Sequence, residues 1–341
     1  MPPAPTHFKE SHVIIHRLRL SGLVCGAMLA AFAGSAVALS PQRTFVATGG
    51  SDANPCSLTA PCRSFGAAIA VVAAGGEVIV LDSGGYGAVT INQSVSIISP
   101  AGVYAGITVI SGTGITVNGS SGDVAVLRGL TVVGQGGSVG ISSTSLGTTH
   151  IESCVVSGMT AGAGISTTTP GKVYIKDTNV RNNFNGITLA STTTPGYAAL
   201  DRVRLEGNQN GLWVFNARAS MHDSEATGNV IGVVVGSVSA SDAPSLDVES
   251  SVISNNSQSG IQGANAVGHG TFSVANSSVT NNGGGGIGVG IGGGTSDAAR
   301  VSNTTIIGNN SGVSSIVVSV GGNVLEGNSF GNTFATTLPK K

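Results

Sequence analysis

Apolar and polar residues alternate in short runs along most of this chain, and a glycine followed by an aliphatic residue recurs between the runs. Such alternation is typical of β-strands that bury one face. The Gly-aliphatic pairs stand 21 to 28 residues apart, and a period in the twenties is typical of a solenoid whose units stack on one another. The pattern therefore predicts an all-β solenoid, with coils marked by Gly140-Ile141, Gly164-Ile165, Gly186-Ile187, Gly211-Leu212, Gly232-Val233, Gly260-Ile261 and Gly286-Ile287.

Alignment of the coils on their own residues assigns each position a face, because alternate side chains of a strand point to opposite sides. One predicted inward column is Ile151, Ile175, Leu200, Met221, Val248 and Val274. A second inward column, five residues later, is Val156, Val180, Leu205, Ala226, Ile253 and Val279. Small residues lie between the two, among them Cys154, which we expect to be a buried, inert thiol.

Asparagine recurs at the bend of each coil, and the set is Asn183, Asn208, Asn229, Asn256, Asn282 and Asn310. Asparagine tolerates unusual backbone angles, and its amide can bond to the coils above and below. We interpret these residues as a structural ladder. The alternative is a polar stripe that binds a ligand.

Residues 39–91 predict an entry module that differs from the coils. Short strands are expected over 44–47 and 77–81, and Ser64 can cap a small-residue helix over 65–74. A helix over the open end of a β-stack covers strand edges that would otherwise recruit other chains. Cys56 and Cys62 stand six apart in a loop with two prolines, and we interpret them as a local disulfide.

The first 38 residues are typical of a secretory signal peptide. Basic residues precede a small, apolar run over 20–38, which ends in the cleavage pattern Ala36-Val37-Ala38. The alternative is a membrane anchor, because the run approaches the ~20 residues needed to span a bilayer. With cleavage the protein is expected to be secreted or periplasmic, without a membrane span, in a compartment that permits disulfides.

The entry module resembles the first segment of the pectate-lyase-like superfamily of right-handed parallel β-helices. The matching residues are Gly50-Ser51-Asp52-Ala53-Asn54-Pro55, Ala60-Pro61-Cys62-Arg63-Ser64, Gly76-Glu77-Val78-Ile79-Val80 and Gly84-Gly85-Tyr86. The resemblance implies a single-stranded right-handed parallel β-helix with a short N-terminal capping helix. Its coils are expected over 92–331, followed by a tail at 332–341. The superfamily includes many members without a known reaction, so the resemblance implies a fold and not an activity.

Charge is sparse in this chain and concentrated on one predicted face. Only 9% of the residues are charged and the formal net charge is −1, which excludes a basic surface for nucleic acid. The residues directly after the first inward column point outward and alternate in sign over several coils. This charged column is Arg128, Glu152, Lys176, Asp201, His222 and Glu249, continued by Ala275 and Asn303.

The charged column can carry chemistry. A lyase of acidic polysaccharides needs a base such as Lys, Arg or His, and a cation or metal to neutralise the uronate carboxylate. A hydrolase needs two carboxylates, which Asp201 and Asp223 can supply. The candidate catalytic residues are Lys176, Asp201, Arg202 and His222, and the candidate substrate-binding residues are Glu152, Tyr174, Trp213, Asp223 and Glu249. The alternative interpretation is a charge ladder that keeps the strands in register.

Trp213 follows an inward leucine, so we expect its ring to face outward on the next sheet, where it can stack on a sugar. A tryptophan partly covered by a neighbouring turn is the alternative.

Three observations argue against an enzyme. The coils are too short for long cleft-building loops, no acidic cluster resembles a Ca²⁺ site, and Gly268-His269-Gly270 lacks the aspartate partners of polygalacturonases.

The sequence therefore predicts an exported, monomeric β-helix protein that contacts cell-envelope or extracellular polysaccharide, with no established catalysis, cofactor or metal. One alternative is a polysaccharide lyase or glycoside hydrolase acting on an acidic polysaccharide. The other is a purely structural surface or adhesion protein.

Overall fold

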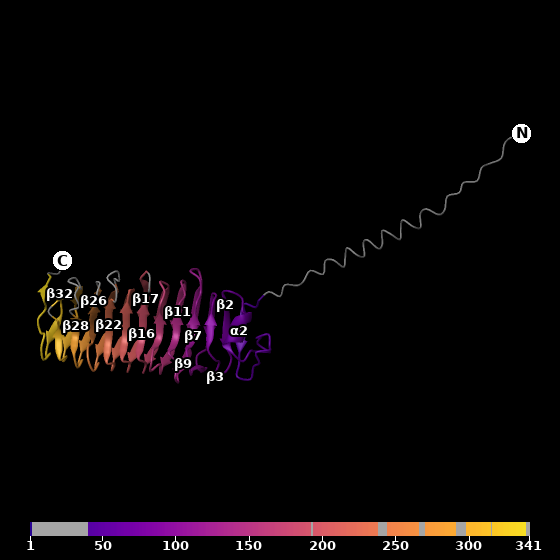
Figure 1. Ribbon diagram of the computed structural model, residues 1–341, viewed down its shortest axis with the longest axis horizontal. Helices are drawn as coiled ribbons and strands as arrows, with labels where there is room; N and C mark the ends of the chain where they lie inside the picture. The colour runs from indigo at the N-terminus through magenta and orange to yellow at the C-terminus, as the bar shows by residue number, and fades with distance from the viewer. Residues whose placement is uncertain are drawn as a thin grey trace. The chain divides into compact units, whose positions relative to one another are not determined.

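The computed structural model describes residues 1, 40–191, 194–237, 244–265, 270–290, 298–314 and 316–338. From residue 40 onward the chain winds into a parallel β-helix (Figure 1). The predicted signal peptide beyond Met1, and His269, lie outside the described residues. Within the described part, no helix is both long and apolar enough to cross a bilayer.

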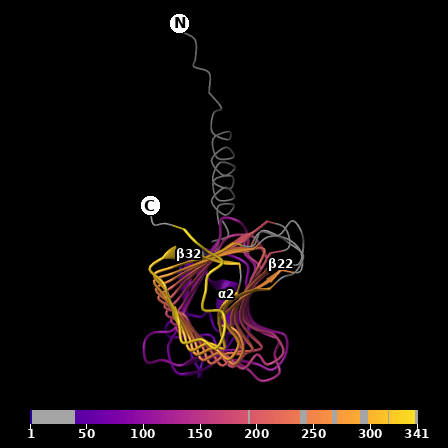
Figure 2. The same cartoon turned by 90° about the vertical axis from the view of Figure 1, so that its left-hand side faces the viewer.

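Three parallel sheets, here named A, B and C, form the walls of the solenoid, with 13, 11 and 10 strands over the described residues. Most coils contribute one strand to each sheet, so the coils superpose when the solenoid is viewed along its axis (Figure 2). The prediction of an all-β parallel solenoid is confirmed.

Sheet A contains, in spatial order, β1 (Arg43–Val46), β2 (Gly76–Val80), β5 (Val95–Ile98), β8 (Val124–Arg128), β11 (Thr148–Glu152), β14 (Lys172–Lys176), β17 (Gly196–Asp201), β20 (Ala217–His222), β23 (Ser245–Glu249), β26 (Thr271–Ala275), β29 (Ala298–Ser302), β32 (Val317–Gly321) and β34 (Thr336–Thr337). Sheet B contains β3 (Gly84–Gly85), β6 (Ala105–Val109), β9 (Leu130–Gly134), β12 (Val155–Ser157), β15 (Asn179–Arg181), β18 (Arg204–Glu206), β21 (Glu225–Thr227), β24 (Val252–Ser254), β27 (Ser278–Thr280), β30 (Thr305–Ile307) and β33 (Val324–Glu326). Sheet C contains β4 (Val89–Ile91), β7 (Thr113–Val117), β10 (Val139–Ser143), β13 (Ala163–Thr167), β16 (Asn185–Ala190), β19 (Asn210–Phe215), β22 (Ile231–Ser237), β25 (Ile261–Asn265), β28 (Gly285–Gly290) and β31 (Ser311–Val313).

Both predicted inward columns fill the interior of the solenoid. The column from Ile151 to Val274 lies in sheet A and the column from Val156 to Val279 lies in sheet B, and every member is at most 1% exposed. Cys154 is a free, buried cysteine between them, and burial raises the pKa of its thiol to about 11. The thiol therefore stays protonated and inert at neutral pH, as predicted.

The asparagine ladder is confirmed with one correction. Its members are buried and each side-chain amide donates to the side-chain oxygen of the next, at 3.0 Å from Asn183 to Asn208 and 2.8 Å from Asn282 to Asn309. The prediction of Asn310 was wrong, because the ladder residue follows the residue with left-handed backbone, here Gly308 with φ +71°. The ladder continues to Asn328.

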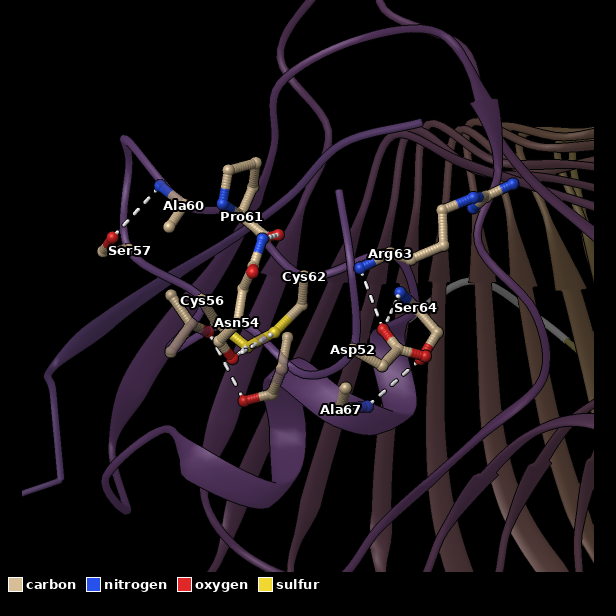
Figure 3. The surroundings of a disulfide bond; sticks show 12 residues. Asp52, Asn54, Cys56, Ser57, Ala60, Pro61, Cys62, Arg63, Ser64 and Ala67 are labelled. Carbon is tan, nitrogen blue, oxygen red and sulfur yellow. Dashed lines mark hydrogen bonds between the residues drawn. A yellow bond between two sulfur atoms is a disulfide. The ribbon is translucent and has the colours of Figure 1, made fainter. Parts of the chain in front are cut away.

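The N-terminal end is covered by the helix α2 (Phe65–Val71). Ser64 accepts a hydrogen bond from the Ala67 amide at 3.2 Å and donates to the Asp52 carboxylate at 2.9 Å, so the cap is itself held in place (Figure 3). The helix ends three residues before the predicted end, because Val72 takes an extended backbone with ψ 141°. The predicted cap is therefore confirmed and the predicted helix end is wrong.

The disulfide between Cys56 and Cys62 is confirmed, and both cysteines are buried beside the capping helix (Figure 3). The backbone of this loop also joins sheet A, because the Phe45 amide donates to the Cys56 carbonyl at 2.8 Å and the Cys62 amide donates to the Phe45 carbonyl at 2.9 Å. The disulfide thus fixes a loop that runs alongside the first strand.

Candidate functional site

The outer face of sheet A carries the charged column in strict register. Cα pairing aligns Arg128, Glu152, Lys176, Asp201, His222 and Glu249 across β8, β11, β14, β17, β20 and β23. Adjacent members are therefore one strand spacing apart, about 4.8 Å. The prediction of Asn303 as the last member was wrong, because Ser302 pairs with Ala275 and Asn303 lies in the following turn with φ +47°.

Most charges of this column neutralise one another. Arg128 contacts Glu152 at 2.7 Å, and the ammonium of Lys176 lies 3.7 Å from the carboxylate of Asp201. Arg202 reaches Asp201 at 3.0 Å and Asp177 at 2.7 Å. All of these pairs are solvent-exposed, and such pairs contribute little to stability individually.

The residues that follow the charged column occupy a one-residue turn with left-handed backbone. Asp177, Arg202 and Asp223 have φ of +50°, +53° and +47°, a conformation that is unfavourable for a long side chain such as arginine. Hydrogen bonds from Arg202 hold the pKa of Asp177 below its ordinary value and raise the pKa of Arg202. The turn thus places Arg202, whose backbone conformation is strained, between the carboxylates of Asp177 and Asp201.

One group of the described residues has donor atoms close enough for a metal. Atoms of Asp201, His222 and Asp223 lie within 4.8 Å of one another, and His222 Nδ1 is 3.2 Å from Asp223. However, Asp201 is already paired with Arg202 and Lys176, whose positive charges would compete with a cation. The donor set is therefore a weak match for a metal centre.

A hollow of about 250 Å³ lies beside the charged column on the outer face of sheet A. It is lined by His150, Glu152, Tyr174, Ile175, Lys176, Ala199 and Asp201. The rings of His150 and Tyr174 stack at 5.0 Å with 16° between their planes, whereas the next residue in register is the small Ala199. Because the side chain of Ala199 is much smaller than that of Tyr174, space is left beside the Tyr174 ring.

The hollow combines a flat aromatic wall with charged groups at its edge. Aromatic faces pack on the C–H face of a sugar, and nearby charges can bond to its hydroxyl or acidic groups. The volume is below the ~300–1,000 Å³ of sites that enclose a drug-sized ligand. The arrangement therefore suits one unit of a longer chain that lies across the sheet.

The structure brings together only part of the predicted site. Glu152, Tyr174, Lys176 and Asp201 line the hollow. Arg202, His222, Asp223 and Glu249 lie further along or beside the charged column. Trp213 faces outward on sheet C, between Thr188 and Val234 in register, so it belongs to a different wall of the solenoid.

Trp213 is half-buried, and its indole N–H is buried without a hydrogen-bond partner. Its ring packs against Phe215 with 4.6 Å between centroids. Both alternatives for Trp213 therefore hold in part: the ring faces away from the core, and it is also partly covered.

Two further columns lie on the outer face of sheet A, and of their members the sequence-based candidate site included only Tyr174. The middle column, two residues before the charged column, contains His150, Tyr174, Ala199 and Ser220. The edge column, four residues before it, contains Thr148, Lys172, Tyr197, Arg218 and Ser245. The period-2 alternation that located the charged column also locates these two, so the signal was present in the aligned coils.

Comparison with known proteins identifies the fold. No family model and no curated protein matches the sequence. Among solved structures, the chain is similar to pectate lyase Pel9A with a TM-score of 0.61 and 18% identity, over 86% of this chain and 80% of that one. It is also similar to the A-module of the Azotobacter vinelandii mannuronan C-5 epimerase AlgE4, with a TM-score of 0.53 and 17% identity over 72% of each chain. The chain therefore has the pectate-lyase-like parallel β-helix fold that its entry module implied.

Proposed function

We propose that this chain is an exported protein that binds cell-envelope or extracellular polysaccharide on the outer face of sheet A. The observation that carries the proposal is the hollow beside the stacked rings of His150 and Tyr174. A flat aromatic wall next to a small residue is a natural contact for a sugar ring. The signal-like N-terminus and the Cys56–Cys62 disulfide support export.

Binding is favoured over catalysis by the state of the charged groups. Two of the three candidate bases, Lys176 and Arg202, are each paired with a carboxylate, and the third is His222. Hydrogen bonds from Arg202 to Asp177 raise the pKa of the arginine, and a group that stays protonated is unsuited to removing a proton. The two solved structures that are similar in fold are named as a pectate lyase and a mannuronan C-5 epimerase. Both names refer to a polysaccharide, which supports a polysaccharide as the ligand.

A glycan array with the purified full chain tests the proposal. We expect binding to at least one polysaccharide, and Tyr174→Ala should weaken it about two- to tenfold because a stacking contact is lost. Tyr104→Ala is the matched control, since Tyr104 is 50% exposed on the loop before β6, away from the hollow. The proposal fails if no glycan binds, or if both variants bind like the wild type.

A lyase or hydrolase is the second candidate, and one observation favours it. His222 Nδ1 lies 3.2 Å from Asp223, an arrangement that orients an imidazole for proton transfer. A lyase would release an unsaturated uronate that absorbs in the near ultraviolet, and His222→Ala and Lys176→Ala should abolish the release. If product forms equally with both variants, these residues are not catalytic. If the protein is purely structural, we expect neither glycan binding nor release of an unsaturated uronate.

A further inference from the structure

The edge column of sheet A places two cations on either side of an exposed tyrosine. Lys172, Tyr197 and Arg218 pair in direct register across β14, β17 and β20. Tyr197 is 43% exposed and its ring centroid lies 6.0 Å from that of Tyr174. The edge column is therefore continuous with the aromatic wall of the hollow.

These two cations differ from the cations of the charged column. Among the residues that the structure describes, neither Lys172 nor Arg218 lies within ion-pair distance of a carboxylate, whereas Arg128, Lys176 and Arg202 all do. Their neighbours in register are Thr148, Tyr197 and Ser245, which carry no charge. Over the described residues, the edge column thus carries two positive charges without an ion-pair partner.

The spacing of the cations matches a polymer that runs along the solenoid axis. Lys172 and Arg218 are two strands apart, which corresponds to about 10 Å at the usual strand spacing. A pyranose linked through positions 1 and 4 advances by nearly one strand spacing, so consecutive sugars lie over consecutive coils. The two cations then face the first and third of three consecutive sugars, and Tyr197 faces the second.

We infer that the ligand is an anionic polysaccharide whose acidic groups bind Lys172 and Arg218 while the intervening sugar packs on Tyr197. This inference rests on the proposed function and adds to it the charge of the ligand, its direction across the strands and its minimum length. A two-unit oligomer reaches only one of the cations, whereas three units reach both.

Calorimetric titration of the full chain with pectate oligomers tests the inference. The oligomers range from two to six units, and a second set carries methyl esters on every carboxyl and is therefore neutral. We expect affinity to rise sharply between two and three units, and the neutral set to bind more weakly. Lys172→Ala and Arg218→Ala should each weaken binding about two- to fivefold at low salt, with a smaller loss at high salt.

Arg181→Ala and Arg300→Ala are matched controls, because both arginines are exposed and lie outside ion-pair distance of any carboxylate in the described chain. Both should bind pectate oligomers like the wild type. Equal binding of charged and neutral oligomers, or equal losses in the controls, overturns the inference while the proposed function stands. Absence of binding to every oligomer and to a glycan array overturns both.

Discussion

The middle coils and the later coils of this solenoid share one interior and differ in their outer surface. Between Thr148 and Thr227 the sequence holds twelve charged residues, whereas between Val252 and Gly321 it holds only Asp297 and Arg300. The inward columns and the asparagine ladder run through both regions without a break. Folding thus constrains the inward positions equally, and the outward positions are free to differ.

This difference indicates that the charge of the middle coils is not needed to build a coil. The later coils reach the same parallel register with serine, threonine and asparagine on their outer faces. A charge ladder that maintains register is therefore unnecessary for the fold, although the middle coils contain one. The aromatic wall, the hollow and the edge column all lie where the charges lie, which supports a role in binding.

Substitutions in the asparagine ladder are expected to have the largest effect on stability, and they test whether the middle and later coils share one interior. Asn229→Ala and Asn282→Ala each remove a buried amide that bonds to the next ladder residue and to a backbone carbonyl. We expect each to lower the free energy of unfolding by about 3 kcal/mol, because buried backbone groups lose their partners. Denaturant unfolding measures both, and a clear difference between the two variants would contradict a common interior.

Substitutions in the turn that follows each sheet A strand are expected to have a smaller effect on stability. Arg202 and Asn276 occupy equivalent left-handed positions, with φ of +53° and +51°, and asparagine tolerates this conformation better than arginine. Arg202→Asn should raise the free energy of unfolding by about 0.5 kcal/mol despite the loss of its exposed ion pairs. The reciprocal Asn276→Arg should lower it by about 1 kcal/mol.

Thermal unfolding of the reciprocal pair is the measurement. A loss of stability in Arg202→Asn comparable to that in Asn276→Arg would mean that the ion pairs of Arg202 outweigh its backbone strain. The middle coils would then depend on their charges in a way that the later coils do not.

The smallest effect is the pH dependence of the middle coils. Hydrogen bonds from Arg202 lower the pKa of Asp177 in the folded state, so this stabilisation is complete above the unfolded value of about 3.9 and is lost as the pH falls through the folded pKa. Solvent screening limits it to less than about 1 kcal/mol. Asp177→Asn should therefore destabilise the protein at pH 6 but have a smaller effect at pH 3.

Ser250→Ala is the control, because Ser250 occupies the same turn position without a titrating group. Its effect on the melting temperature should be the same at both pH values. A pH-dependent effect of Ser250→Ala equal to that of Asp177→Asn would show that the turn, and not the carboxylate, is sensitive to acid.

Much of the coil interior could be predicted from the sequence, because alternation and period together identify inward positions. Both inward columns, the buried Cys154, the Ser64 cap and the disulfide followed from local signals. The errors arose at turns. Asn309 and Asn310 are adjacent in the sequence, and only the left-handed backbone of Gly308 decides that the Asn309 amide enters the ladder.

The candidate site could be predicted only in part. The alignment of the coils places His150, Tyr174 and Ala199 opposite one another on the outer face, as the structure has them. That the rings of His150 and Tyr174 stack at 5.0 Å and leave a hollow beside Ala199 depends on side-chain conformations, which periodicity does not determine.

The sequence by itself therefore determined that this protein is a parallel solenoid, which residues its coils bury, and where its few charges gather. These properties follow from local periodicity, which each coil carries independently of its neighbours. Only the tertiary structure decided that Trp213 lies on a different wall from the charged column and that Lys176 and Arg202 are paired, whereas Lys172 and Arg218 have no ion-pair partner among the described residues. Those properties depend on side-chain contacts between coils, which form when residues more than twenty positions apart are stacked in register.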